Sequence, residues 1–148
     1  MADLNQNRGC RRIAGAWGNL HIDGELIFEV EECEASIEVQ RGDVLVGNNV
    51  DSKITGLAGS GSFTIKHVYT RGVQKYLDIL KEGHDPRFVA SISFNDPDAV
   101  GGQVERVNIG NCWINTLPLS GFSRSEVVEK QFEFGFTPSD ADFAEGIY

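Results

Sequence analysis

Cysteine is scarce in this chain of 148 residues. Cys10, Cys33 and Cys112 are far apart, and no Cys-x-x-Cys pair is present. This spacing supports neither a disulfide framework nor a zinc site, and it fits a reducing compartment. We therefore expect no metal and no cofactor.

Basic residues are also few: 13 Lys and Arg face 22 Asp and Glu, a net charge of −9. A protein that reads DNA or RNA sequence needs the opposite sign, so we expect no sequence-specific nucleic-acid partner. The deficit is concentrated in residues 24–38, which contain no Lys or Arg. The acidic side chains there are Glu25, Glu29, Glu31, Glu32, Glu34 and Glu38.

Long apolar runs are missing. The longest uncharged stretch, residues 107–123, is interrupted by asparagine, glycine and proline, which excludes a membrane span. The 4 prolines fall at strand ends or in turns, so none guards a strand interior against edge-to-edge pairing. Open strand edges are therefore expected.

Catalytic motifs are missing as well. The histidines are isolated, and GLAGSG at 56–61 lacks the Lys-Ser/Thr of a phosphate loop, which favours a glycine-rich bend. Asp96 and Asp98 favour a tight turn over a calcium loop, because Val107 stands where the final glutamate would be. We predict that the chain is not an enzyme.

Period-two alternation dominates the sequence and predicts a mainly β fold. One domain, residues 1–148, is expected, with a hairpin turn at Asp23-Gly24. The apolar phase of the following run, 25–39, changes near Glu31-Glu32, which predicts a bulge. Further strands are expected at 61–69, 87–95, 104–115 and 126–136. The architecture is then a β-sandwich or barrel with one flanking helix.

The helix is expected over about residues 71–82. Thr70 is its N-cap, Gly83 its stop, and Val73, Tyr76, Leu77 and Leu80 form its apolar stripe. Residues 138–148 show no pattern and are expected to form a tail, and residues 1–14 an arm.

Residues 40–59 are rich in turn formers yet carry several large apolar side chains. They predict an extended loop, which in a compact domain is usually functional. A short strand pair at the sheet edge is the alternative.

Four segments in order resemble the tail tube protein of contractile (myovirus-type) phage tails. The likeness is greatest to the XkdM-type proteins of defective prophages and phage-tail-like bacteriocins. It covers about residues 15–140, through GAWGNLHIDGE (15–25), TGLAGSGSFTIKHVYTRG (55–72), LKEGHDPRFVASISFNDPDAVGGQVERVNI (80–109) and EKQFEFGFTPSD (129–140).

The resemblance implies a subunit without catalytic residues that forms stacked hexameric rings, a hollow conduit for DNA passage or envelope puncture. It implies tail sheath, baseplate and terminator proteins as partners, in a particle assembled in the bacterial cytoplasm. In such tubes, inner strands of neighbouring subunits join into one barrel, and an extended loop reaches the adjacent ring.

Two site expectations follow from joining this resemblance to the residues. Alternation allows one set of glutamates to line the channel: Glu25, Glu29 and Glu31, or Glu32, Glu34 and Glu38. Residues 41–58 form the ring-stacking loop and bury Val44, Leu45, Val46 and Leu57. An ordinary solvated outer face is the alternative for the glutamates.

Two other functions stay open. A baseplate or terminator adaptor would share the tube fold. A monomeric β-barrel that binds a ligand would need an empty interior, whereas the strand faces with Phe88, Ile92, Phe94, Phe132, Phe134 and Phe136 predict one filled by side chains.

Overall fold

The structure is a computed structural model that describes residues 9–27, 30–66 and 70–148. It is mainly β, with an 8-stranded antiparallel sheet and one helix, as predicted. The strands are β1 (Gly18–Ile22), β2 (Glu25–Leu26), β3 (Val30–Val46), β4 (Asn49–Lys66), β5 (Arg87–Phe94), β6 (Glu105–Thr116), β7 (Glu129–Phe136) and β8 (Ala141–Glu145), and the helix is α1 (Arg71–Lys81). Short 3₁₀ turns lie at Gly9–Arg11, Gly15–Trp17, Val100–Gly102 and Pro138–Asp140.

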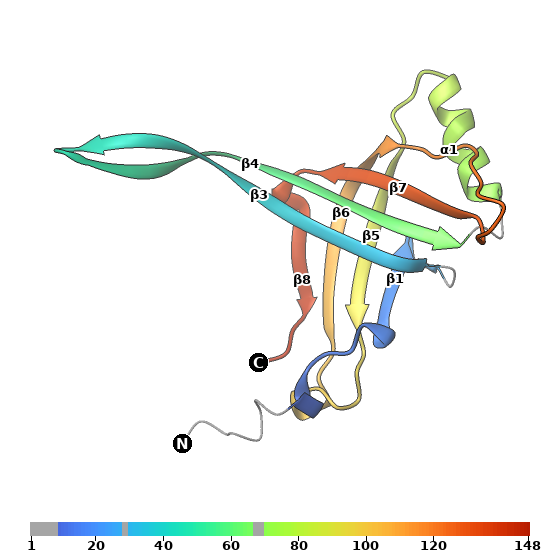
Figure 1. Cartoon of the computed structure of the whole chain (residues 1–148), viewed down its shortest axis with the longest axis horizontal. Coiled ribbons are helices and arrows are strands. Elements are labelled where there is room, and N and C mark those ends of the chain that lie inside the picture. The colour runs from blue at the N-terminus through green and yellow to red at the C-terminus, as the bar shows by residue number, and fades with distance from the viewer. Residues whose placement is uncertain (1–8, 28–29, 67–69) are drawn as a thin grey trace.

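The sheet folds into two layers that share strand β6. Its order is β2-β1-β5-β6-β7-β4-β3, and β8 also pairs with β6. The first part of β6 lies between β5 and β8, and its last part pairs with β7. In Figure 1, β3, β4 and β7 cross steeply over β1, β5, β6 and β8. The predicted sandwich architecture is therefore confirmed.

A bulge in β6 marks the place where this strand passes between the layers. Phe88 faces Cys112 and Ala90 faces Ile109, so two residues of β6, Gly110 and Asn111, oppose one residue of β5. Asn111 has a φ of 54°. Bulges bend and twist a strand, and strands that switch sheets commonly use them at the corner.

The first hairpin is confirmed, with Asp23 and Gly24 at φ values of 52° and 82°. Residues 25–39, however, do not form one strand, because β2 ends at Leu26 and β3 begins at Val30. The predicted bulge is present: Val30 faces Ile65 and Glu32 faces Thr64, so the residue between them on β3 is extra.

The expectation of an extended loop at 40–59 is wrong. Strands β3 and β4 continue through this segment to a turn at Gly47, whose φ is 63°. The alternative, a pair of strands, is right, but the two strands are long rather than short. Pairing satisfies backbone groups that a loop of this length would leave to water, and β-branched residues fit a pleated ribbon.

The segment 138–148 is not a patternless tail. It contains β8, which pairs with β6 from Ala141 opposite Ile109 to Glu145 opposite Arg106. The side chain of Gln103 also exchanges hydrogen bonds of 2.9 and 3.2 Å with the backbone of Tyr148. Backbone pairing at a sheet edge requires no apolar alternation, which is why the sequence pattern missed this strand.

Helix α1 agrees with its predicted range and ends before Gly83, whose φ is 83°. Val73 is buried, and the Tyr76 ring meets the Phe88 ring edge-on at 6.1 Å, so the helix packs against the core. Leu80 does not belong to the buried stripe, because it is 44% exposed at the last turn. Tyr69 of the predicted strand 61–69 lies outside the described residues.

Aromatic rings fill the space between the layers. Phe63 and Phe132 stack at 4.8 Å, and Phe134 lies 6.1 Å from Phe63 and 5.9 Å from Phe88. Such aromatic pairs add about 0.5–1.5 kcal/mol beyond their buried area.

The glycine-rich bend expected at 56–61 is instead part of the interior of β4. Its glycines make room for the rings. A Cβ at Gly61 would lie 2.4 Å from the Phe134 ring, and one at Gly59 would lie 2.5 Å from the Phe136 ring.

Gly61→Ala is expected to lower the free energy of unfolding by about 1–3 kcal/mol, because the added methyl overpacks the core against Phe134 and the backbone of Glu34. Chemical denaturation measures this change. Gly121→Ala is the matched control, because a Cβ there has no atom within 4 Å. Equal stabilities of the two variants would contradict the packing role of Gly61.

Asn111→Val should destabilise the fold by about 1–2 kcal/mol, because a β-branched residue is disfavoured at positive φ. Asn111→Gly should be tolerated, because glycine adopts this φ without strain. Thermal unfolding compares the two. A Val variant as stable as the Gly variant would show that the corner of β6 does not require the left-handed conformation.

Candidate functional site

The described residues hold no group of three or more His, Cys, Asp or Glu side chains placed to bind a metal. The described cysteines are free, and burial raises the pKa of Cys33 and of Cys112 to about 11. These two thiols are therefore protonated at neutral pH and poor nucleophiles. In the same part of the chain, no helix has the length and apolar character needed to span a membrane.

Asp96 has a structural role. Its buried carboxylate accepts hydrogen bonds from the backbone N–H of Ala14 at 3.0 Å and of Asp98 at 2.9 Å. This is the tight turn that the sequence predicts, and it also ties down the end of the N-terminal arm. His67, one of the isolated histidines, lies outside the described residues.

The first extended surface is the outward side of β3, β4, β7 and the end of β6, here called the polar face. Residues directly opposite in an antiparallel sheet point to the same side. The register therefore gives three polar rows: Glu32–Thr64–Gln131, Glu34–Ser62–Glu133–Thr116 and Ser36–Ser60–Gly135–Trp113.

One of the two predicted glutamate sets lies together on this face. Glu32, Glu34 and Glu38 alternate with half-buried Cys33 and Ala35 and with Ile37, and all three are exposed. Ser62 Oγ donates to Glu34 Oε1 at 3.4 Å.

The other set is not brought together. Glu25 lies on β2 in the second layer, and Glu29 lies outside the described residues. Glu31 is the extra residue of the bulge and forms an ion pair with Lys66 at 3.6 Å. The pKa of Glu129 is raised, because its protonated carboxyl donates a hydrogen bond to Glu31 and because the negative charge of Glu31 disfavours a second carboxylate beside it.

Sequence reasoning missed Glu133, which also lies on the polar face. It accepts a hydrogen bond from Thr116 Oγ1 at 3.1 Å. The signal was present: Gln131 and Glu133 alternate with Phe132, Phe134 and Phe136 along β7.

The second surface lies on the hairpin of β3 and β4. Strand β4 pairs with β7 only from Gly59 onward, so the distal hairpin, residues 38–58, forms a two-stranded ribbon that projects from the body (Figure 1). The side of the ribbon and its base that continues the core face carries exposed apolar side chains, here called the apolar stripe: Ile37, Val39, Leu45, Val50, Ile54 and Leu57. Arg41, Asp43 and Ser52 lie on the same side and divide the stripe into a part near the body and a part at the tip.

The stripe only partly matches the predicted stacking residues. Leu45 and Leu57 belong to it and are 76% and 53% exposed. Val44 and Val46 are exposed on the opposite side, where they face Asp51 and Asn49. The odd apolar phase of residues 33–39 identifies Ile37 and Val39, but Arg41 and Asp43 interrupt it before Leu45, so alternation alone did not identify the whole stripe.

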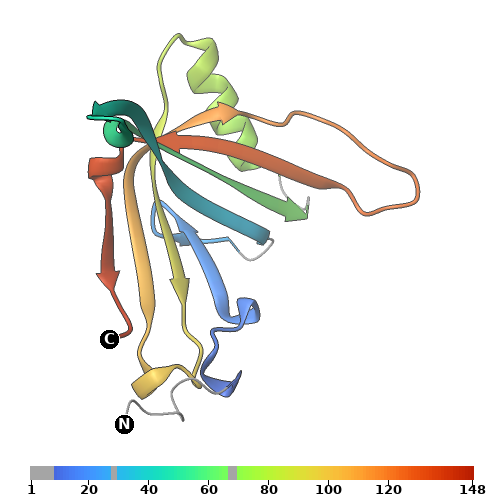
Figure 2. The same ribbon diagram turned by 60° about the vertical axis from the view of Figure 1, so that its left-hand side comes forward.

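A smaller apolar group lies on the connection between β6 and β7. Figure 2 shows this loop extending on the side away from β8. It exposes Leu119, Phe122 and Val127, and buried Lys130 holds it through a 3.2 Å hydrogen bond from Nζ to the Leu119 carbonyl.

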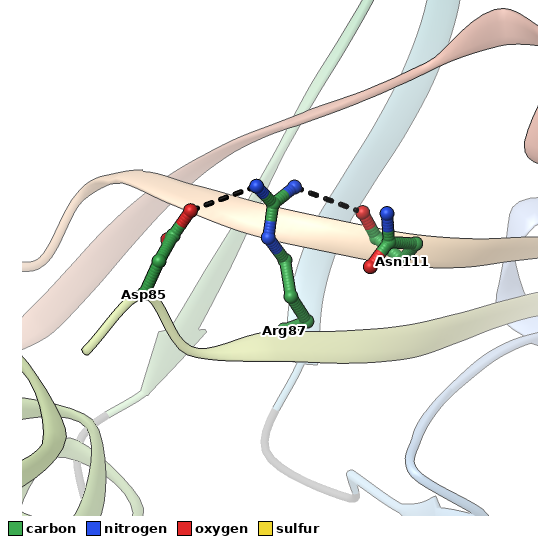
Figure 3. Close-up of polar contacts among 3 residues, drawn as sticks. All are labelled: Asp85, Arg87 and Asn111. Carbon is green, nitrogen blue, oxygen red and sulfur yellow. Dashed lines mark hydrogen bonds and ion pairs between the residues drawn. The ribbon is translucent and has the colours of Figure 1, made fainter.

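Arg87 lies at one end of the row Ser36–Ser60–Gly135–Trp113 of the polar face, because it is opposite Trp113 in the register of β5 and β6. Its guanidinium contacts Asp85 Oδ2 at 2.7 Å, donates to the Asn111 carbonyl at 3.5 Å and lies 4.9 Å from the centre of the Trp113 ring. Figure 3 shows the two polar contacts on either side of the guanidinium. Trp113 in turn covers Gly135, where a Cβ would lie 2.6 Å from the indole.

A sequence family described as "Phage tail tube protein" matches residues 5–145. "Phage-like element PBSX protein XkdM" of Bacillus subtilis (strain 168) is 28% identical over 131 residues, which cover 86% of this chain and 88% of that protein.

Solved structures share the fold. A chain of the "anti-feeding prophage cap (AFP tube terminating cap)" aligns with a TM-score of 0.73, 12% identity and coverage of 99% of this chain and 100% of that chain. A chain of an "Extracellular Contractile Injection System, PVC sheath-tube complex in extended state" gives a TM-score of 0.73, 8% identity and the same coverages. The resemblance read from the four sequence segments is confirmed.

Proposed function

Because the chain belongs to the phage tail tube protein family, we propose that it is the repeating subunit of a hollow tail tube built from stacked six-membered rings. Family membership makes it a structural component of a phage tail or phage-like particle, and the prediction that it is not an enzyme is confirmed. The hexamer, the stacking and the two surface assignments below are our proposals.

The apolar stripe on the ribbon is the observation that carries this proposal. A soluble monomer rarely leaves so many large apolar side chains exposed on one projecting element, and such patches usually mark interfaces. Burying each side chain contributes about 1.5–3 kcal/mol. The ribbon extends beyond its own subunit, so a second copy in the adjacent ring is the natural partner for the stripe.

The polar face suits the lumen. Most of its side chains are carboxylates, hydroxyls and amides, among them Glu32, Glu34, Glu38 and Glu133. Trp113 and Lys66, which pairs with Glu31, lie at its margins. Carboxylates repel phosphates within a screening length of about 8 Å at physiological salt, so DNA would slide along such a wall without sticking. The same wall suits a tube that punctures an envelope without carrying DNA.

The partners are inferred from the fold relatives. One of these belongs to a sheath-tube complex and another to a tube-terminating cap. We infer that sheath, baseplate and terminator proteins contact the assembled tube, and that no sequence-specific nucleic-acid site is needed.

A terminator or baseplate adaptor is the second candidate, because the terminating cap aligns as well as the sheath-tube complex does. Negative-stain microscopy separates the two, since an adaptor forms single rings and a tube subunit forms long tubes. The aromatic rings that fill the core argue against a monomeric ligand-binding barrel.

Leu45→Asp is expected to leave the subunit folded but raise the protein concentration needed for tube formation roughly tenfold or more, since it removes apolar burial at every ring boundary. Sedimentation and negative-stain microscopy measure assembly. Val46→Asp is the matched control, because Val46 is next to Leu45 in the chain but its side chain lies on the other side of the ribbon. Normal tubes from Leu45→Asp would contradict the stacking role of the stripe.

The lumen assignment is tested with Ser62→Cys in a Cys10→Ser background. In assembled tubes, a small maleimide should label this cysteine, whereas a bulky polymer-linked maleimide should label it only in free subunits. Gln74→Cys, on the exposed side of α1, provides the comparison. Labelling of Ser62→Cys by the bulky reagent along intact tubes would place the polar face outside.

A further inference from the structure

Lys130 is a buried cation with few partners. It lies on the core side of β7, opposite Ile65, and is only 6% exposed. Its Nζ donates a hydrogen bond to the Leu119 carbonyl at 3.2 Å, and no described carboxylate forms an ion pair with it. An ammonium group has more donors than this one bond uses, so its burial is costly for the subunit.

The bond from Lys130 fixes the connection between β6 and β7, residues 117–128. This connection contains no helix or strand, and its backbone hydrogen bond from Glu126 to Ser123 lies within it. Leu117 packs against the core where the connection begins. Among the described residues, the Lys130 bond is the one hydrogen bond that ties the connection to the body.

The fixed connection presents an apolar surface to the outside. Leu119, Phe122 and Val127 are exposed, and Phe122, the largest of them, is 76% exposed. Arg124 lies between Phe122 and Val127 in the chain and is also exposed, without an ion pair to a described residue. Apolar side chains gathered in this way mark an interaction surface.

The tip of the ribbon has matching chemistry. Leu45 and Val50 face each other on the side of the apolar stripe, and Asp43 precedes them on the same side. Asp43 is exposed and forms no ion pair with a described residue. An apolar pair beside a carboxylate is therefore available to meet an apolar group beside a guanidinium.

The two surfaces lie at opposite ends of the molecule. Figure 1 shows the ribbon tip at one end of the longest axis and the connection from β6 to β7 at the other end. Copies in successive rings of a stack repeat one orientation, so unlike ends meet. Such a head-to-tail contact between different surfaces continues from copy to copy without closing.

We propose, on the basis of the tube function proposed above, that Lys130 is a positioning residue that holds residues 117–128 as the receiving surface for the ribbon tip of a copy in the adjacent ring. The apolar side chains of the tip pack against those of the connection, and Asp43 faces Arg124. The buried ammonium thus serves the geometry of assembly and not the stability of the subunit.

Lys130→Met tests the positioning role, because methionine has a similar shape and no donor. Its free energy of unfolding should equal or exceed that of the natural chain, since a buried charge is removed. The concentration needed for tube formation should nevertheless rise by about threefold or more. In free subunits, trypsin should cleave faster after Arg124. Lys75→Met, on the exposed side of α1, is the control that loses the same charge.

Unchanged assembly and unchanged cleavage of folded Lys130→Met overturn the positioning role. A variant that is less stable than the natural chain overturns it as well, because Lys130 then has an ordinary structural role.

The contact itself is tested with Asp43→Cys and Arg124→Cys combined in a Cys10→Ser background, in which the remaining cysteines are half-buried or buried. Oxidation of assembled tubes should link more copies than one ring contains, because a contact between rings does not close. Each single-cysteine variant is the control and should give no such series on a non-reducing gel.

A series of linked copies that ends at the size of one ring would place the contact within the ring, and the absence of links would show that another surface covers the connection. Either result overturns the proposal, while tubes of the natural chain leave the proposed function standing. A natural chain that stays monomeric at high concentration overturns both.

Discussion

A two-stranded ribbon is at best marginally stable in water, and the rest of this structure depends on how that ribbon is held. Strands β3 and β4 form it over residues 38–58, where β7 does not pair with β4. Their other halves belong to a packed sandwich, so the core fixes the register of the ribbon from its base. The chain thereby presents apolar side chains far outside its own core without unfolding, which is what an assembly element requires.

Glycine and bulges allow one sheet to supply both layers. Gly59 and Gly61 leave space for Phe136 and Phe134 on the inner side of β4. The bulge at Asn111 turns β6 from one layer into the other, and the bulge at Glu31 sets the phase of β3. Because side chains alternate strictly along a strand, each bulge decides which of the residues that follow it in the strand face the core and which face outward.

These local features divide the molecule into surfaces with different chemistry. The inner side of β3, β4 and β7 is aromatic, and the outer side carries carboxylates and hydroxyls. Past the body, the inner side continues as the apolar stripe, because the core layer ends while the strands go on. A tube wall needs both kinds of surface: one that solvent or cargo can touch, and one that only another subunit can cover.

The sequence by itself determined the local elements. Alternation identified most strands, Asp23-Gly24 and Gly83 marked a turn and a helix end, and the phase change at Glu31-Glu32 revealed a bulge. Tertiary structure decided that residues 40–59 pair as strands, that β8 joins β6, and that Glu32, Glu34 and Glu38 share a face with Glu133. The reason is physical: propensity and periodicity act between near neighbours, whereas pairing and register depend on backbone partners distant in the chain.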